Sequence, residues 1–468
     1  MRAIGSFQAC RNTFIAPWTR KSPAAPKSAG FTMVAGPSTR GGLSFLPTTP
    51  DIGSLSGDLD HEVRNLTTVS GMAAETQDEA RPNLDWLSAQ PYEGWEEARQ
   101  SECPVFGVNS DVMGPGTFYQ VTKFKDVDAV LRDDKTFSSS INGVHIGQFM
   151  GDLILAMNGE EHRKYRNLVA KAFRASQLER WDDTLVRPII NRLLDDIAPL
   201  GQADLVATIT SKYPVQVICG IAGVPLEDSA QFARWAEEIN TGPMSPERGH
   251  AASAAMVDYL RPLVEARRAE STGDFLSDLV HTEVDGERLN DDKIYGFLRL
   301  LLPAGGETTF RVMGNALLAL LTHPDDLERV YADRDLVPEV IEETLRWETS
   351  VTMVSRIATA DTEISGCPIE KGSPMGILTG SANHDEDRWE DAADWKLGRP
   401  VQHHLAFGTG PHQCLGMHLA RLELRVGLNE ILDRLPNLRL KPEAVDEAVI
   451  EGFAFRGPRA LPVTFDPS

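Results

Sequence analysis

One cysteine near the end of the chain lies in a loop whose composition suits a metal ligand. The loop reads AFGTGPHQCLGMHLARLE over residues 406–423, and its second half is an amphipathic helix. Gly408 and Gly410 permit a tight turn that lets backbone N–H groups approach the sulfur. Cys414 lies at the predicted helix start, where the helix dipole favours a thiolate, and Gly416 leaves room for a flat macrocycle. A buried structural cysteine after a Gly-rich turn is the alternative.

A second candidate site lies upstream, where LLPAGGETTF spans residues 301–310 of an apolar helical segment. Each of the two adjacent glycines costs roughly 1 kcal/mol relative to alanine, so we expect them to open the helix beside a ligand. Glu307 and Thr308 follow at once, and a carboxylate beside a hydroxyl could hold water and deliver protons. The alternative is a solvated Glu307 and a Thr308 that bonds back to its own helix.

Together these segments resemble the cytochrome P450 family of the soluble bacterial type. The family's haem-binding loop has the same phenylalanine seven residues before the cysteine and the same glycine two residues after it. The resemblance implies that Cys414 is the proximal iron ligand, whose thiolate favours O–O cleavage, and that Phe407 packs beside it. Residues 304–309 match the family's oxygen-activation motif throughout, which implies that Glu307 and Thr308 relay protons to dioxygen.

Four further residues match the family's contacts to the cofactor. Haem carries two propionates, which need cationic partners when they are partly buried. His162 and Arg166 are four residues apart on one helical face and match the family's propionate clamp. Arg356, on a predicted strand, matches a further propionate ligand, and His412 in the cysteine loop completes the set. Each of these residues alone could be a solvated surface cation.

The segment EETLRW places Glu343 and Arg346 three residues apart on one helical face, where they can pair. In the family, a later arginine joins this pair and braces the haem-binding core, and Arg399 is our candidate. The triad is expected to support folding without taking part in chemistry. The segment ANHDEDRW departs from the family at His384, where arginine is more usual. We expect haem binding and oxygen activation to be kept despite this departure.

The elements that must position these residues are mostly helical. Residues 160–321 show helical periodicity interrupted by turn signals, and a last helix is predicted at residues 415–435. Short strands are predicted at residues 117–124 and 354–377, with a short helix at 126–132. The predicted fold class is therefore mainly α with minor β-sheets. By the resemblance, this is the cytochrome P450 fold with a single haem domain, which we assign to residues 81–468.

Composition excludes several other classes of protein. A formal net charge of −22 argues against nucleic acid as a partner, because phosphate binding depends on clustered Lys and Arg. The five cysteines are scattered and odd in number, which argues against a disulfide framework and for a reducing compartment such as the cytoplasm. No apolar stretch is long enough for a transmembrane segment.

Residues 1–80 form an extension that we exclude from the fold. The first fifty residues carry six Lys or Arg and no acid, with abundant Ser, Thr, Pro and Gly. This composition is typical of an organelle transit peptide, which would change the expected cytoplasmic location. A disordered tail, or sequence upstream of a true start at Met33 or Met72, is the alternative that we prefer.

The resemblance implies a haem-thiolate monooxygenase that uses haem b and inserts one oxygen atom from O2 into an apolar small molecule. The pocket would draw on Ile141–Leu155, the helix face before Ala304, Val351–Val354 and the loop around Phe453. These segments are largely apolar, which favours a terpenoid, steroid, fatty-acid or aromatic substrate. Because no flavin or iron–sulfur segment accompanies the domain, electrons from NAD(P)H would arrive through a separate ferredoxin and ferredoxin reductase.

Arg421 and Arg425, on the helix after the cysteine, would either contact an acidic ferredoxin or simply solvate that helix. Three other functions stay open for the same haem domain, namely a peroxide-driven peroxygenase, a nitric-oxide reductase and a non-catalytic haem sensor. None of the three needs an acid–alcohol pair. The presence of Glu307 and Thr308 therefore favours the monooxygenase.

Overall fold

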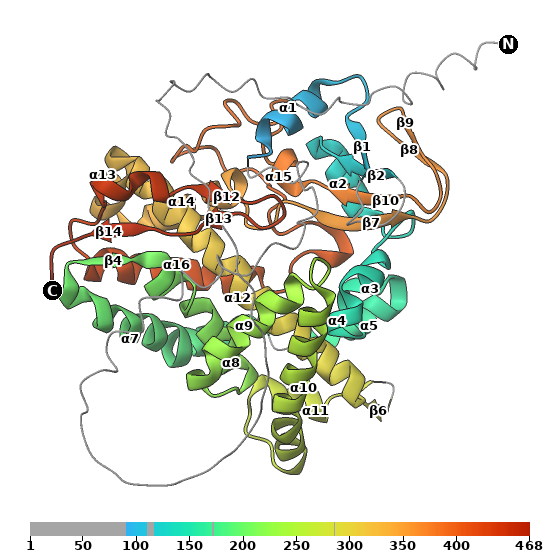
Figure 1. Cartoon of the computed structure of the whole chain (residues 1–468), viewed down its shortest axis with the longest axis horizontal. Coiled ribbons are helices and arrows are strands. Elements are labelled where there is room, and N and C mark those ends of the chain that lie inside the picture. Colours follow the sequence, from blue (N-terminus) through green and yellow to red (C-terminus); the bar gives the residue numbers. More distant parts are fainter. Residues whose placement is uncertain (1–89, 110–116, 171–172, 285) are drawn as a thin grey trace, which may run out of the picture. The chain divides into compact units, whose positions relative to one another are not determined.

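The computed structural model describes residues 90–109, 117–170, 173–284 and 286–468. The fold is built mainly from helices, with small sheets, as predicted (Figure 1). Within the described residues, none of the helices has both the length and the apolar character needed to cross a membrane. The expectations for residues 1–80 lie outside the described part of the chain.

The helices follow the predicted stretches closely. Helix α16 begins two residues after the predicted position 415 and ends one residue before 435. In chain order the helices are α1 (Tyr92–Gln100), α2 (Phe124–Arg132), α3 (Ile141–His145), α4 (Gly147–Met150), α5 (Gly159–Ala170), α6 (Ala175–Trp181), α7 (Arg187–Ile197), α8 (Tyr213–Ala222), α9 (Ser229–Asn240), α10 (Pro246–Ala269), α11 (Phe275–His281), α12 (Asp291–Thr322), α13 (Pro324–Ala332), α14 (Val337–Trp347), α15 (Thr379–Ala382) and α16 (Met417–Arg434).

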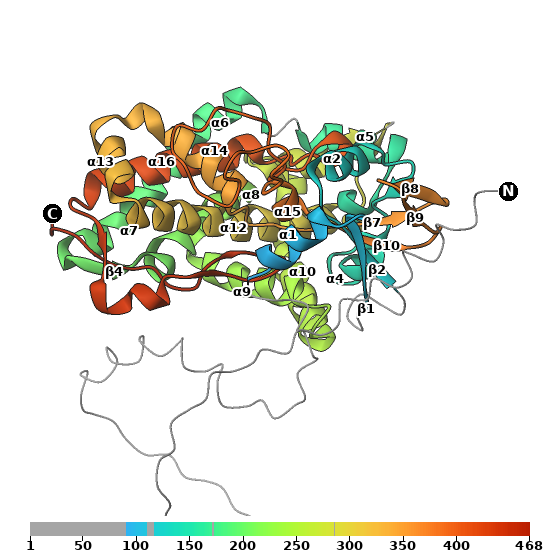
Figure 2. The same ribbon diagram turned by 90° about the horizontal axis from the view of Figure 1, so that it is seen from above.

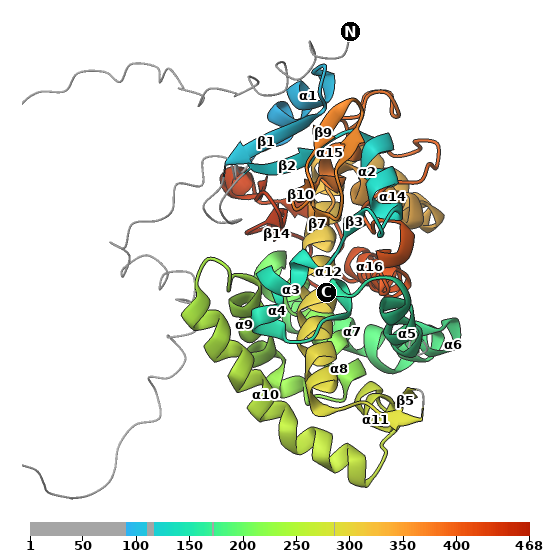
Figure 3. The ribbon, with the colours of Figure 1, turned by 90° about the vertical axis from the view of Figure 1, so that its right-hand side faces the viewer.

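Helix α12 is the central element of the described fold, and it carries the acid–alcohol pair (Figure 3). Its 32 residues span about 48 Å at 1.5 Å per residue. Asn290 caps its start, because the side-chain oxygen accepts a hydrogen bond from the Lys293 N–H. Every residue from Val312 to Leu320 is buried, as expected for a helix packed on all sides. Figure 2 shows α12 crossing the fold, with α14 and α16 on one side and α9 on the other.

The two glycines of α12 serve a purpose that differs from the predicted one. The helix stays continuous through Gly305 and Gly306, so the expectation that they open it is wrong. A Cβ atom on Gly305 would lie 2.7 Å from Ile218, and one on Gly306 would lie 2.8 Å from Val215. Both contacts come from α8. The missing side chains therefore let α8 pack directly against the backbone of α12.

The main sheet has five strands in the order β1-β2-β10-β7-β3. Strands β2 and β10 are parallel, and the other neighbours are antiparallel. In the β7–β10 pair Arg356 lies opposite Met375, which fixes the position of this predicted cofactor residue. The strands of this sheet are β1 (Val105–Asn109), β2 (Thr117–Val121), β3 (Phe137–Ser138), β7 (Val354–Ala358) and β10 (Pro374–Ile377).

Four smaller sheets complete the described strands. One has three strands in the order β11-β14-β4, and the others are hairpins. Their strands are β4 (Gln202–Asp204), β5 (Glu283–Val284), β6 (Glu287–Arg288), β8 (Thr362–Ile364), β9 (Cys367–Ile369), β11 (Arg439–Leu440), β12 (Ile450–Glu451), β13 (Gly457–Pro458) and β14 (Pro462–Thr464).

Two of the scattered cysteines form a disulfide, which corrects the expectation drawn from their number. Cys103 and Cys367 are 264 residues apart in sequence, yet their Cα atoms lie 5.8 Å apart. The bond joins the segment before β1 to the β8–β9 hairpin. Spacing along the chain carried no sign of this pairing, because the two cysteines meet only through the tertiary fold.

Reduction of this disulfide is expected to lower the free energy of unfolding by about 2 to 4 kcal/mol, because the bond restricts the unfolded chain. Urea unfolding with and without a phosphine reductant measures the difference. A Cys103→Ser variant is the control, since its unfolding midpoint should no longer respond to the reductant. An equal midpoint for the oxidised and reduced wild-type protein would show that the bond contributes nothing.

Candidate functional site

The cysteine loop forms the tight turn that its glycines predict. Gly408 and Gly410 have φ angles of +62° and +71°, which lie in the left-handed region that favours glycine. A Cβ atom on Gly410 would lie 2.5 Å from the carbonyl oxygen of Leu131, so the loop also packs closely against the end of α2. The Cys414 N–H donates to the Phe407 carbonyl at 2.8 Å and closes the turn. The loop therefore holds the cysteine backbone rigidly, three residues before α16.

The Cys414 side chain combines an accessible surface with a marked influence of burial. Its surface is exposed, yet burial is the largest influence on the pKa of its thiol and raises that pKa. The sulfur therefore stays open to a ligand, although protein surrounds much of it. The backbone N–H of Gly416 and the charges of Arg166 and Arg421 act in the opposite direction and favour the thiolate. The sulfur is thus presented as a ligand.

The structure brings the four predicted propionate residues into one cluster. The His162 ring, on α5, stacks on His412 of the cysteine loop with 3.9 Å between ring centroids. Arg166, one turn further along α5, donates from Nη2 to the Gln413 carbonyl at 2.5 Å. Arg356 on β7 is 3% exposed, and burial lowers its pKa to about 10. Burial and the neighbouring cations also lower the pKa of His412 to about 3.

This cluster fits an anionic cofactor group. His162 Nδ1 and His412 Nε2 are buried without a hydrogen-bond partner among the described residues. The hydrogen bonds of Arg166 and Arg356 go to backbone carbonyls rather than to carboxylates. Buried polar and cationic groups require partners, and haem propionates would satisfy both the charges and the free ring nitrogens.

On α12, the structure departs from the simplest version of the predicted acid–alcohol pair. The Thr308 hydroxyl donates to the Ala304 carbonyl at 2.8 Å, which is the back-bonding that the sequence left open. Glu307 is not a solvated acid, because Arg311 Nη2 donates to its Oε1 at 2.7 Å and Asn240 Nδ2 to its Oε2 at 2.5 Å. Sequence reasoning missed both partners. The spacing of four residues signals Arg311, whereas Asn240 comes from another helix, α9.

The predicted bracing triad is confirmed as a buried ion-pair cluster. Arg346 makes two hydrogen bonds to Glu343, of 2.7 and 2.9 Å, and Arg399 Nε donates to Glu343 Oε1 at 3.0 Å. Arg346 also donates to the carbonyls of Asn383 and Ala392. The cluster therefore ties α14 to the segment that leads into the cysteine loop.

His384, the departure from the family pattern, is accommodated as a neutral side chain. It is 5% exposed, and its Nε2 lies 2.6 Å from the Trp347 carbonyl, which requires a proton on that nitrogen. Its ring stacks on Tyr92 with 4.2 Å between centroids. Burial lowers the pKa of His384 to about 3, so the ring stays uncharged near neutral pH.

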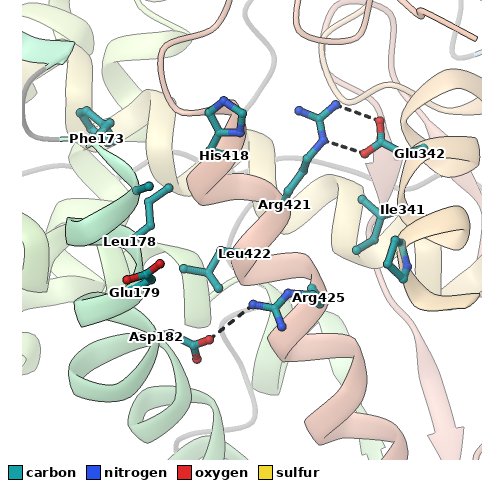
Figure 4. Close-up of a pocket in the computed structure, with 12 residues that line it drawn as sticks. Phe173, Leu178, Glu179, Asp182, Ile341, Glu342, His418, Arg421, Leu422 and Arg425 are labelled. Carbon is teal, nitrogen blue, oxygen red and sulfur yellow. Dashed lines mark hydrogen bonds and ion pairs between the residues drawn. The ribbon is translucent and has the colours of Figure 1, made fainter. Parts of the chain in front are cut away.

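A groove of about 560 Å³ lies beside α16, between this helix, α6 and α14 (Figure 4). Arg421 reaches across it and makes two hydrogen bonds to Glu342, of 2.6 and 2.8 Å. Arg425 lies 3.4 Å from Asp182 on the other wall. Burial raises the pKa of Glu342, but hydrogen bonds from Arg421 and His404 outweigh it and hold the value at about 2. Both arginines of the sequence analysis are thus paired with acids.

An accessible cysteine in a Gly-rich loop, next to two arginines that donate to backbone carbonyls and two histidines with unpaired ring nitrogens, fits the cofactor site of a haem-thiolate enzyme. Comparisons with known proteins give the family. A sequence model described as cytochrome P450 matches residues 244–451. A steroid C26-monooxygenase of Mycolicibacterium smegmatis is 32% identical over 406 residues, which cover 84% of this chain and 98% of the relative. The chain belongs to the cytochrome P450 family and is a P450 monooxygenase.

Further relatives agree with this membership. The mycinamicin IV hydroxylase/epoxidase of Micromonospora griseorubida is 35% identical over 355 residues, covering 74% of this chain and 89% of the relative. The structure of a cytochrome P450 from Chondromyces apiculatus has 32% identity and a TM-score of 0.72, covering 81% of this chain and 96% of that one. A Bacillus megaterium P450 solved with testosterone has 29% identity and a TM-score of 0.71, covering 81% and 99%. Family membership implies haem and a small-molecule substrate.

Proposed function

We propose that this enzyme binds haem b through Cys414 and inserts one oxygen atom from O2 into an apolar small molecule. The observation that carries the proposal is the accessible Cys414 beside the buried ring nitrogens of His162 and His412, which have no hydrogen-bond partner among the described residues. Bound haem supplies the redox chemistry, and the protein supplies the ligand, the proton path and the pocket. We assign these roles to the domain formed by residues 81–468.

We assign two tasks to the residues around the cofactor. Cys414 binds the iron as a thiolate, which the Gly416 N–H and nearby Arg166 stabilise. His162, Arg166, Arg356 and His412 bind the propionates, and the unpartnered ring nitrogens support this assignment. The propionates would also offset the positive charge that the fold concentrates between α5, β7 and the cysteine loop.

Glu307 and Thr308 are proposed to move protons toward the side of the haem where dioxygen reacts. The Thr308 hydroxyl donates its hydrogen to Ala304, so its oxygen lone pairs can still accept a hydrogen bond from water or from a carboxylic acid. Glu307 is the acidic side chain next to Thr308 in the sequence. Proton transfer through this pair would let the O–O bond break productively.

Replacing Thr308 by alanine is expected to lower the product formed per NAD(P)H by about tenfold and to release peroxide instead. The reason is that the variant lacks the hydroxyl group through which protons are proposed to pass. Product and peroxide are measured in the same turnover assay. Thr308→Ser, which keeps the hydroxyl, is the matched control and should couple like the wild type. Unchanged coupling in Thr308→Ala would contradict the relay.

The segments predicted to form the substrate pocket support an apolar substrate. Val351 pairs with Phe455 in an isolated β-bridge, which places Val351–Val354 beside the loop that carries Phe453. A Cβ atom on Gly296 of α12 would lie 2.6 Å from the Asp152 carbonyl, so the segment after α4 lies directly on α12. Since relatives include a steroid monooxygenase and a P450 solved with testosterone, we propose a steroid or terpenoid substrate. Spin-state titrations with such compounds test this choice against fatty acids and simple aromatics.

We propose a ferredoxin and its NAD(P)H-dependent reductase as the electron donors, with docking over the groove of Figure 4. Glu342 makes a bidentate pair with Arg421 and so neutralises the charge of that arginine. Arg425 is half exposed and makes a longer contact, so it is the cation that can change partners. Because the relatives include bacterial P450s, we propose the cytoplasm as the compartment despite the Cys103–Cys367 bond, with an organelle as the alternative if residues 1–80 carry a targeting signal.

Arg425→Glu is expected to slow reduction by the ferredoxin about tenfold at low ionic strength, and less in high salt, because screening removes the electrostatic contribution. Stopped-flow reduction of the ferric protein measures the rate. Arg439→Glu, a charge reversal at an exposed site on β11, is the control. Equal rates for the two variants would argue against this docking surface. If no ferredoxin pair supported NAD(P)H-dependent oxidation, the peroxygenase, nitric-oxide reductase and sensor functions would come back into question.

A further inference from the structure

Glu307 lies on the flank of α12, between two faces of different character. Leu302, Gly306 and Phe310 follow one another at helical spacing and line a cavity of about 270 Å³ between α8, α9 and α12. Ala304 and Thr308 lie on a second stripe, which is turned about the helix axis by roughly 160–200° from Gly306. Because Glu307 projects between these stripes and lines the cavity, its carboxyl group is within reach of both faces.

Two donors hold the Glu307 carboxyl group on the cavity side. Arg311 Nη2 binds Oε1 at 2.7 Å, and Asn240 Nδ2 binds Oε2 at 2.5 Å. The side chains of Glu307 and Arg311 are 15% and 23% exposed, so the pair is neither sealed in the core nor fully solvated. Arg311 balances the charge from the same helix. Asn240 is the donor that reaches Glu307 from outside α12.

The position of Asn240 is itself fixed by packing. It is the last residue of α9, and the turn that follows it lies directly on α4. A Cβ atom on Gly242 would lie 2.9 Å from the Phe149 ring. Phe149 belongs to the stretch 141–155 that we assign to the substrate pocket. The amide of Asn240 also has no titratable proton, so it can orient a carboxyl group without competing for the proton that this group carries.

We propose that Asn240 is a positioning residue of the proton relay. It holds the carboxyl group of Glu307 at the cavity, where that group takes up a proton from solvent. The protonated carboxyl group then turns across the flank of α12 and gives its proton to the Thr308 oxygen, while the Thr308 hydroxyl turns away from Ala304 and gives its own proton to the oxygen substrate. The carboxylate then returns to Asn240 and Arg311. This inference rests on the proposed relay role of Glu307.

A double-mutant cycle tests the inference with Asn240→Leu, Glu307→Gln and the combined variant. Asn240→Leu is expected to lower the product formed per NAD(P)H by about threefold to tenfold. In the Glu307→Gln background the same change should have no further effect, because the group that Asn240 positions has lost its acid proton. Thr241→Val is the matched control, since the Thr241 hydroxyl in the same turn bonds to the Glu237 carbonyl and should not affect coupling.

The urea-unfolding midpoint of the resting protein supplies a readout that does not depend on turnover. If the Asn240–Glu307 hydrogen bond is present, the midpoint shifts of the two single variants should add up to more than the midpoint shift of the combined variant. Additive midpoints, or equal uncoupling by Asn240→Leu in both backgrounds, would overturn the inference. If Glu307→Gln formed as much product per NAD(P)H as the wild type, the relay role of Glu307 would be contradicted, and this inference with it. Uncoupling by Glu307→Gln but not by Asn240→Leu would overturn the inference alone.

Discussion

Replacing Cys414 by alanine is expected to abolish the strongly red-shifted Soret band that a thiolate ligand gives the reduced, carbon monoxide-treated enzyme. Turnover should fall to background, since the variant lacks the thiolate that promotes O–O cleavage. The loop backbone should keep its shape, because the Cys414 N–H, not the sulfur, closes the turn to Phe407. The variant therefore separates ligand chemistry from folding.

The measurement is a difference spectrum of wild type and variant at equal protein concentration. Cys219→Ala is the control, because Cys219 is the other free cysteine among the described residues and is buried in the core. Its variant should keep the red-shifted band. A band at the ordinary histidine-haem position in the wild type, unchanged in Cys414→Ala, would mean that Cys414 is not the iron ligand.

Glu343→Gln is expected to destabilise the protein by about 3 to 5 kcal/mol, because it removes the one carboxylate shared by two arginines. The side chains of Arg346 and Arg399 are 3% and 9% exposed, so solvent cannot take the place of Glu343. Since the cluster ties α14 to the segment before the cysteine loop, we also expect the variant to lose haem more readily.

Urea unfolding and the rate of haem transfer to apomyoglobin measure the two effects. Glu339→Gln is the matched control, since Glu339 is exposed on the same helix and should change stability by less than about 0.5 kcal/mol. A Glu343→Gln protein as stable as this control would show that the two arginines find other partners. The cluster would then not brace the haem-binding core.

The parts of the site that the sequence predicts are those built from local spacing. The cysteine loop lies within eleven residues, and the pairs His162–Arg166 and Glu343–Arg346 lie within one helical turn. Their geometry follows from helix and turn rules alone. Arg399 was placed by the family resemblance, and the structure confirms that it pairs with Glu343. The mainly helical fold could also be predicted from the sequence, because amphipathic periodicity marks most of the helices.

What the sequence could not predict depends on contacts between distant segments. Asn240 meets Glu307 across 67 residues, and Cys103 meets Cys367 across 264. The role of Gly305 was misjudged because a helix interior glycine can serve either a ligand or a neighbouring helix, and only the position of α8 distinguishes the two. The stacking of the His162 and His412 rings likewise exists only once α5 packs against the cysteine loop.

The placement of α12 also bears on how this enzyme can acquire new specificities. The residues proposed to handle protons occupy little more than two turns, from Ala304 to Arg311, whereas the helix begins at Asp291, thirteen residues earlier. Leu300 and Leu301 are half-buried upstream of this segment, so substitutions there could reshape the proposed substrate pocket without touching the proposed acid–alcohol pair. Laboratory evolution toward a different substrate should find tolerated diversity upstream of Ala304, and a sharp loss of function once mutations reach Glu307.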